Sequence, residues 1–265
     1  MHRIVIYNIT ILLSIGLISH INNAYADRNI DYWSKINQST SNNKSYINTC
    51  SLNDLRSPIN INKVLVKPFA PLNIKYTKIP ITIINKKFHL EMESYEREKI
   101  TIDNNDEYFL KKIKIITNSE HRINNNIFPL EIQFIHTSNK HNRFLVLSVF
   151  GEYSKTTHHS LQKIISRIPT MEEYRRGYSA LINLNKIIEN TDEYFRYNGT
   201  LTSKSCDDAI WLIIKKPIKV TKKQIKLIRS KLAQNLYRNN RNIIQPINNR
   251  LIKYYTKQYQ YIKKD

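Results

Sequence analysis

The chain has 265 residues, enough for one domain or two small ones, and its 42 Lys or Arg against 21 Asp or Glu give a formal net charge of +21. This excess points to an anionic partner: nucleic acid, an acidic polysaccharide or a membrane surface. After residue 26 no stretch is apolar enough to span a bilayer, which excludes a chain built around transmembrane helices.

Residues 1–26 have the pattern of a secretory signal peptide. They begin with a short basic stretch, continue with a long apolar run and end in Ala-Tyr-Ala before Asp27, a small-x-small cleavage site. An uncleaved anchor is the alternative, but the run is short for a span and contains Asn8 and Thr10. We therefore expect cleavage after Ala26 and an exported protein, periplasmic or extracellular.

The next part of the chain is predicted to be β-rich. Residues 27–56 are polar and irregular, whereas from residue 57 to about 152 short apolar or alternating runs are separated by turn residues. The expected strands lie at 61–67, 71–77, 81–85, 88–92, 111–117, 129–136 and 144–150.

Helical spacing appears later in the chain. Residues 158–168 and 172–188 carry it in part, and residues 209–220 return to the pattern of a strand. Residues 221–237 predict a helix that begins with a capping box of Thr221 and Gln224.

The helix at 221–237 is predicted to be amphipathic. Its apolar face comprises Ile225, Ile228 and Leu232, and Lys222, Lys226 and Arg229 line the other side. With no internal repeat and no linker, the pattern favours a single mostly-β domain over residues 27–250. The pattern also predicts a few short peripheral helices around this domain and a basic tail at 251–265.

The positive charge is concentrated near the C-terminus. From residue 215 to 265 there are 15 Lys or Arg and one acid, a net of +14. An AT-rich genome would favour lysine codons, but it would also permit the acidic residues that are missing. We expect an anion-binding surface on the helix and the tail, formed by Lys222, Lys223, Lys226, Arg229, Lys253, Lys257, Lys263 and Lys264.

Tyrosines between these lysines supply flat stacking surfaces, a combination that suits acidic glycans and single-stranded nucleic acid alike. An exported protein meets acidic glycans or lipid head groups more readily than nucleic acid, so we favour those partners. A solvated basic face without a partner is the plainer alternative.

The only cysteines are Cys50 and Cys206. An even pair in an exported chain indicates one disulfide, and two buried free thiols are the alternative.

Seven short strings resemble, in collinear order, motifs of the alpha-class carbonic anhydrases. They are RSPINI (56–61), NIKY (73–76), YFLKKIKIITNSEH (108–121), FPLEIQFIH (128–136), FRYNGTLTSKSC (195–206), IWLIIKKPI (210–218) and NNRNIIQPINNR (239–250). Together they cover nearly the whole mature chain. The resemblance implies a large, mainly antiparallel twisted sheet with a cone-shaped active site on one face, and it supports a Cys50–Cys206 disulfide at the position of the family's bridge.

The resemblance breaks down at the zinc ligands. In this family three histidines on two neighbouring strands hold zinc, two of them at i and i+2, and a fourth position holds the water that becomes hydroxide. Matching Ser119-Glu120-His121 and Glu131 to the family places Lys114, Ile116 and Gln133 at the ligand positions.

These three residues are poor replacements. An ammonium repels zinc, isoleucine has no lone pair, and a glutamine amide binds zinc weakly. The resemblance therefore predicts no metal and no cofactor at this site.

Three other positions of the family site are retained. Glu120 and Thr202 match the residues that orient the zinc-bound hydroxide, and Glu131 matches the carboxylate that supports a ligand histidine. Their plainer interpretation is structural hydrogen bonding. Because an unpaired buried carboxylate is costly, we expect Lys114 to form an ion pair with Glu131 or Glu120.

Three functions are consistent with these observations. The first is an exported carbonic anhydrase-like protein without catalysis, a binding or adhesion module for an anionic partner. The alternative is an active carbonate dehydratase whose zinc has atypical or relocated ligands. The adjacent His158 and His159 and the scattered His121, His136 and His141 show no strong ligand spacing, which favours the first. A structural or assembly role, with the tail as a docking arm, is a third possibility.

Overall fold

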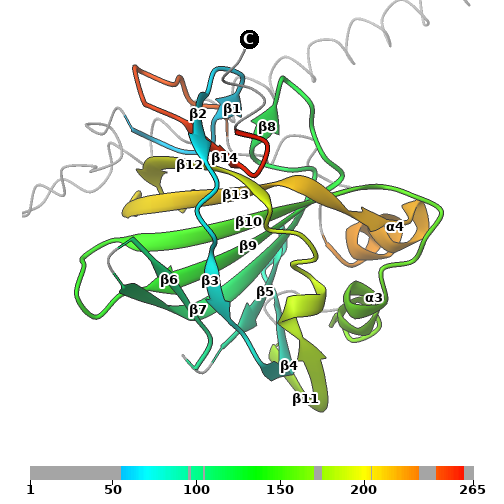
Figure 1. Ribbon diagram of the computed structural model, residues 1–265. Helices are drawn as coiled ribbons and strands as arrows, with labels where there is room; N and C mark the ends of the chain where they lie inside the picture. Colours follow the sequence, from blue (N-terminus) through cyan, green and yellow to red (C-terminus); the bar gives the residue numbers. More distant parts are fainter. Residues whose placement is uncertain are drawn as a thin grey trace, which may run out of the picture. The chain divides into compact units, whose positions relative to one another are not determined.

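The computed structural model describes residues 55–94, 97–103, 105–169, 175–203, 205–232 and 243–259 (Figure 1). The predicted signal peptide, Cys50, Lys263 and Lys264 lie outside the described residues, so the cleavage, the disulfide and the end of the basic tail stay predictions.

The described chain is mostly β, as expected. Its strands are β1 (Asn60–Ile61), β2 (Leu65–Pro68), β3 (Asn73–Lys75), β4 (Lys78–Asn85), β5 (Leu90–Glu93), β6 (Lys99–Ile102), β7 (Asp106–Thr117), β8 (Arg122–Ile123), β9 (Leu130–Thr137), β10 (Phe144–Tyr153), β11 (Arg175–Asn183), β12 (Glu193–Thr200), β13 (Asp208–Val220) and β14 (Lys253–Thr256). The helices are α3 (His159–Ile165), the short 3-10 helix η1 (Leu184–Lys186) and α4 (Lys222–Lys231).

One twisted sheet of 12 strands dominates the structure (Figure 1). Its main order is β11-β4-β5-β7-β9-β10-β13-β12-β14-β2, with β6 pairing both β7 and β3. The ladder is mainly antiparallel, and β10–β13 and β14–β2 are its parallel pairs. The short strands β1 and β8 form a separate parallel pair.

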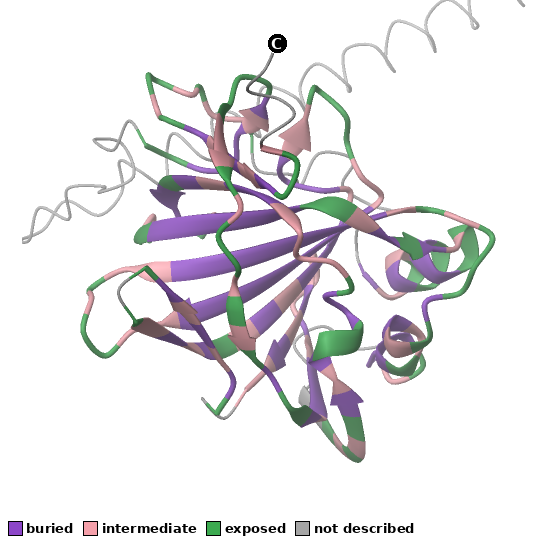
Figure 2. Cartoon of the chain, in the orientation of Figure 1, coloured by how far each residue is buried: buried purple, intermediate pink, exposed green. Residues whose placement is uncertain are grey.

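The two faces of the large sheet carry different apolar clusters, because alternate residues of a strand point to opposite sides. Ile113 and Ile115 of β7 and Ile132 and Phe134 of β9 belong to the larger cluster. The smaller cluster, on the other face, contains Ile135, Val146 and Trp211, among others. Figure 2 shows that the central strands are buried along most of their length.

The helices pack together beside the sheet. Both hydrogen bonds of the predicted capping box of α4 are present. The Thr221 side chain accepts from the Gln224 backbone N–H, and the Gln224 side chain accepts from the Thr221 backbone N–H. Gln224 also donates from Nε2 to the His158 carbonyl oxygen at 2.9 Å, which joins α4 to the start of α3. Within the described part of the chain, no helix is long and apolar enough to cross a membrane.

One expected helical segment is a strand. Residues 172–188 were predicted to be helical in part, but β11 occupies Arg175–Asn183 and η1 follows it. The strand pairs antiparallel with β4, and Tyr178, Ala180 and Ile182 alternate toward the larger cluster. A short apolar run is compatible with the spacing of a helix and with that of a strand. Here the segment forms a strand because β4 offers an edge with which it can pair.

The segment expected as a C-terminal tail is also part of the sheet. β14 pairs antiparallel with β12 and parallel with β2, and it buries Tyr254 and Thr256. The alternation of polar and buried residues in Lys253–Thr256 accounts for this strand, so the domain continues past residue 250.

Candidate functional site

The residues that match the zinc ligands lie together on two neighbouring strands. In the antiparallel pairing of β7 with β9, Lys114 lies opposite Gln133 and Ile116 lies opposite Glu131. Since alternate residues share a face, these side chains all point to the face of the smaller apolar cluster. The sheet therefore places Lys114, Ile116 and Gln133 as a set, as the resemblance predicted.

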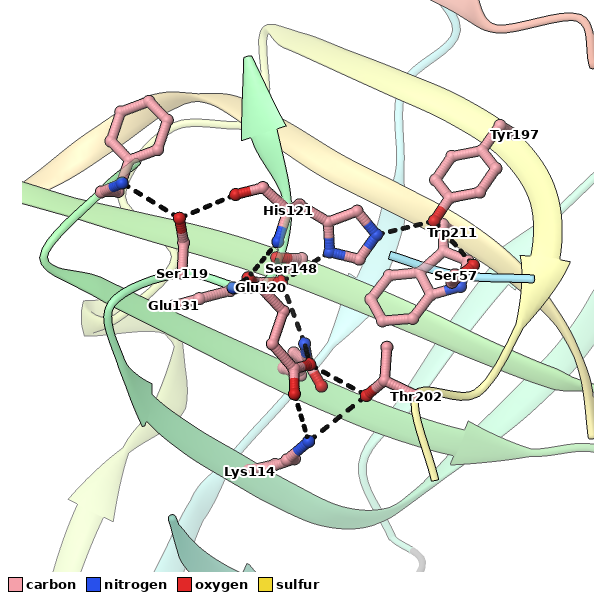
Figure 3. A network of polar contacts seen from close by, with 12 residues as sticks. Ser57, Lys114, Ser119, Glu120, His121, Glu131, Ser148, Tyr197, Thr202 and Trp211 are labelled. Atoms are coloured by element: carbon pink, nitrogen blue, oxygen red, sulfur yellow. Dashed lines mark hydrogen bonds and ion pairs between the residues drawn. The ribbon is translucent and has the colours of Figure 1, made fainter. Parts of the chain in front are cut away.

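Lys114 forms an ion pair with Glu120, one of the two predicted partners. Its Nζ lies 3.0 Å from Glu120 Oε1, and the side chains are only 13% and 5% exposed. The ammonium also donates to Thr202 Oγ1 at 3.3 Å. Figure 3 shows the three residues converging from β7 and the loops after β7 and β12.

Glu120 also accepts hydrogen bonds from residues other than Lys114. Its Oε2 accepts hydrogen bonds from the Thr202 hydroxyl and from Gln133 Nε2, both at 2.9 Å. The Thr202 hydroxyl thus donates directly to Glu120. Gln133, which the resemblance matches to a zinc ligand, donates to the same carboxylate.

Glu131 is fully buried and pairs with His121 rather than with Lys114. Its Oε1 lies 3.0 Å from His121 Nδ1 and also accepts from Gln133 Nε2 at 3.0 Å and Ser148 Oγ at 2.9 Å. Its Oε2 accepts from the backbone N–H groups of Glu120 and His121 at 2.7 and 3.0 Å.

These contacts decide the charge of Glu131. Burial acts to raise the pKa of Glu131, but the charge of His121 and the hydrogen bonds from His121 and Gln133 outweigh it. The pKa of Glu131 is lowered, and the side chain stays a carboxylate.

The network continues from His121 to the other end of the site. His121 Nε2 lies 2.6 Å from the Tyr197 hydroxyl, which lies 2.9 Å from Ser57 Oγ. The His121 ring packs against Trp211 with centroids 4.4 Å apart, and burial raises the pKa of Tyr197. Both ring nitrogens of His121 are therefore satisfied, as in a structural histidine.

The donor set does not fit zinc. The Lys114 ammonium is held by a carboxylate and a hydroxyl, Ile116 offers no lone pair, and the Gln133 amide nitrogen is directed at two carboxylates. Among the described residues, no group of three or more His, Cys, Asp or Glu is placed so that it could hold a metal ion. His158 instead caps α3, accepting at Nδ1 from the Leu161 backbone N–H at 3.1 Å.

The predicted basic surface divides into two separate places. Lys222, Lys223 and Lys226 are exposed on α4, whereas Lys253 and Lys257 belong to β14 and the turn after it, at a different end of the sheet (Figure 1). Lys257 Nζ lies 2.5 Å from Asp192 Oδ1.

Arg229 does not belong to the exposed face of α4. It is half-buried and donates from Nη2 to Asn118 Oδ1 at 2.6 Å, just after β7. This contact anchors α4 to the loop that carries Ser119 and Glu120, because the guanidinium turns back toward the sheet.

Sequence reasoning missed three members of the network, namely Ser57, Ser148 and Tyr197. Ser148 carried a signal, since it is the one polar residue in the apolar run of residues 144–150. Ser57 and Tyr197 lie inside strings that resemble the family, but the resemblance assigned them no role.

Comparisons with known proteins point to carbonic anhydrases. The family model described as eukaryotic-type carbonic anhydrase matches residues 37–256. The chain is 30% identical to alpha carbonic anhydrase 7 of Arabidopsis thaliana over 213 residues, 78% of this chain and 76% of the relative. It is 23% identical to a carbonic anhydrase of Klebsiella pneumoniae over 225 residues, 84% and 86% of the two chains.

Among solved structures, the fold is similar to an alpha-carbonic anhydrase from Thermovibrio ammonificans in complex with the inhibitor sulfanilamide. The TM-score is 0.71 at 24% identity, covering 77% of this chain and 89% of the other. At this identity the likeness concerns the fold.

Proposed function

The chain belongs to the eukaryotic-type carbonic anhydrase family, and on that premise we propose that it is an exported binding protein for an anionic partner, without zinc-dependent hydration of carbon dioxide. The family is zinc-dependent, and its relatives in Arabidopsis thaliana and Klebsiella pneumoniae are named as carbonic anhydrases. The proposal therefore concerns what this member does with a shared fold.

The ion pair between Lys114 and Glu120 carries the proposal. When bound, the family's zinc supplies a Lewis acid that lowers the pKa of a bound water to about 7. Here the ammonium of Lys114 supplies positive charge beside Glu120, and Gln133 Nε2 lies 2.9 Å from Glu120 Oε2 and 3.0 Å from Glu131 Oε1. These side chains satisfy one another, so the polar groups of the site remain paired without a metal.

The anionic partner is supported by the charge of the chain and by the exposed lysines of α4. Lys222, Lys223 and Lys226 form no ion pair among the described residues, and α4 has no acid in its first turn. Lys222 Nζ lies 5.9 Å from the centre of the Tyr153 ring, and Tyr153 is 47% exposed. A charged and aromatic face of this kind suits an acidic glycan or lipid head groups.

Export is supported by the pattern of residues 1–26 and by the even pair of cysteines. Mass spectrometry of the protein recovered from the exported fraction tests both points, since it reports the first residue and the oxidation state of Cys50 and Cys206.

The first experiment is the metal content of the purified protein after dialysis without chelator. Less than about a tenth of a zinc per chain agrees with the proposal. About one zinc per chain, accompanied by carbon dioxide hydration, would support the alternative of an active carbonate dehydratase with atypical ligands. Salt-sensitive retention on heparin then tests the anionic partner, and its absence would leave a structural role.

A further inference from the structure

A cavity of about 370 Å³ lies at the end of the sheet where the chain enters β14. It shares only Tyr197 with the polar network around Glu120 and Glu131. Its lining comes from β12, from the start of β14 and from the residues before β1, and consists of Leu55, Arg196, Tyr197, Asn198, Arg250, Leu251 and Lys253.

The lining is cationic. Three of these residues carry positive charge and none is acidic. Arg196 is compensated by Asp103, to whose two carboxylate oxygens it donates at 2.7 and 2.6 Å. Asp103 also lies within the field of Lys253 and Arg143, so one carboxylate faces several cations.

Arg250 has no carboxylate partner among the described residues. Its guanidinium donates instead to the backbone carbonyl oxygens of Leu55 and Arg56 at 2.8 Å each, and to those of Pro246 and Ile247. Partial burial lowers the pKa of Arg250, so its charge is desolvated without an ionic partner.

These contacts also fix the orientation of Arg250. A guanidinium already held by several carbonyl oxygens loses little freedom when an anion arrives, which is the usual advantage of a preorganised site. Lys253 has no ion pair among the described residues, and the exposed Asn198 of β12 adds an amide.

The remaining walls are apolar. Leu55 and Leu251 are 39% and 56% exposed, so part of their apolar surface is open to a ligand. A volume of about 370 Å³ exceeds that of a bare phosphate and lies near the lower end for small-molecule sites. The lining thus combines cations for an oxyanion with apolar surface for a small organic body.

We propose that this cavity binds a sugar-sized molecule that carries a phosphate or sulfate group, either free or as one unit of an acidic glycan. The inference rests on the proposed function, because it specifies the anionic group of the partner and the cavity that binds this group. The cavity lies apart from α4, so the two can be tested separately.

The test measures binding of glucose 6-phosphate and glucose 6-sulfate by isothermal titration calorimetry, with glucose as the neutral control. We expect the anionic sugars to bind and glucose not to bind. Lys253→Gln should weaken binding about tenfold, the value of one charge-assisted hydrogen bond. Asn198→Asp, at an exposed position, places a carboxylate in the cavity and should abolish binding.

Lys216→Gln is the matched control, since Lys216 is an exposed lysine of β13 outside the cavity lining and should leave binding unchanged. The inference is overturned if neither anionic sugar binds, or if Lys253→Gln and Asn198→Asp bind as well as the parent protein.

A heparin column separates this inference from the proposed function. Retention on heparin without binding of either anionic sugar would retain the proposed function and reject the cavity. Binding of the sugars without retention would support the cavity for free small ligands and reject the polymer. Retention reduced by Lys253→Gln would show that the cavity takes a unit of the glycan.

Discussion

Lys114 Nζ lies 3.0 Å from Glu120 Oε1, and this ion pair joins a residue that the resemblance matches to a zinc ligand with a carboxylate that it matches to a retained residue of the family site. Both side chains are largely buried, so removal of either charge breaks a buried ion pair.

Lys114→Met should therefore destabilise the protein. The methionine fills similar space but removes the ammonium beside Glu120, and breaking a buried pair costs about 3–5 kcal/mol. Urea unfolding at pH 7 measures the loss. The double variant Lys114→Met/Glu120→Gln should recover part of it, because it removes both charges.

Lys112→Met is the matched control on the same strand. The Lys112 side chain is 39% exposed and pairs with Glu91 at 3.0 Å, so its loss should cost no more than about 1 kcal/mol. Equal effects of the two methionine variants would show that the buried pair has no special role.

The triple variant Lys114→His/Ile116→His/Gln133→His should bind zinc. The pairing of β7 with β9 places the three positions on one face, and three imidazoles are a usual catalytic zinc set. Metal analysis after dialysis should find about one zinc per chain.

The control for this variant is Lys114→His/Gln133→His, which lacks the third ligand at Ile116 and should bind zinc far more weakly. No uptake by the triple variant would mean that the strands no longer hold the three positions at ligand distance.

Stability should fall as the pH drops below about 6.5, the ordinary pKa of histidine, because of His136. Burial lowers the pKa of His136 to about 4, and its ring is held by Tyr76 OH at 2.5 Å and the Leu145 carbonyl oxygen at 3.0 Å. Between these pH values the unfolded chain takes up a proton that the folded chain excludes.

The expected loss attributable to His136 is about 2 kcal/mol between pH 7 and pH 5, measured by urea unfolding. His136→Gln should reduce this loss, whereas substitution of the partly exposed His89 by Gln should not. The same loss in all three proteins would assign the pH dependence to other groups.

Substituting Lys222, Lys223 and Lys226 by Gln should lower the salt concentration at which the protein elutes from heparin. Each exposed lysine that contacts the polymer contributes to the salt dependence of binding. The control triple variant replaces the exposed Lys75, Lys78 and Lys216, which lie on three different strands or their ends. Identical elution of the two variants would argue against a localised surface on α4.

Much of the fold could be predicted from the sequence, because strands such as β9 and β10 are long and apolar and the resemblance fixed their order. The strand β11 could not be predicted, because its short apolar run fits a helix equally well. Only its pairing with the edge of β4 identifies it as a strand. The strand at Lys253–Thr256 was also missed. A short basic segment resembles a tail, and only the burial of Tyr254 and Thr256 shows that it belongs to the sheet.

At the site, the sequence predicted that Lys114 pairs with a carboxylate, but not with which of two. The sequence left Glu120 and Glu131 equal as partners of Lys114. The choice depends on the loop after β7, which brings His121 to 3.0 Å from Glu131 and leaves Glu120 for the ammonium. Such a choice is made by three-dimensional proximity and not by spacing along a strand.

The position of β14 has a consequence for the order of assembly. Because β14 lies between β12 and β2, the sheet can be completed only after residues 253–256 have left the ribosome. Until then both neighbours present unpaired backbone groups, which are templates for association with other chains. Truncation at residue 250 would remove β14 and leave both neighbouring strands unpaired, so we expect the shortened chain to aggregate.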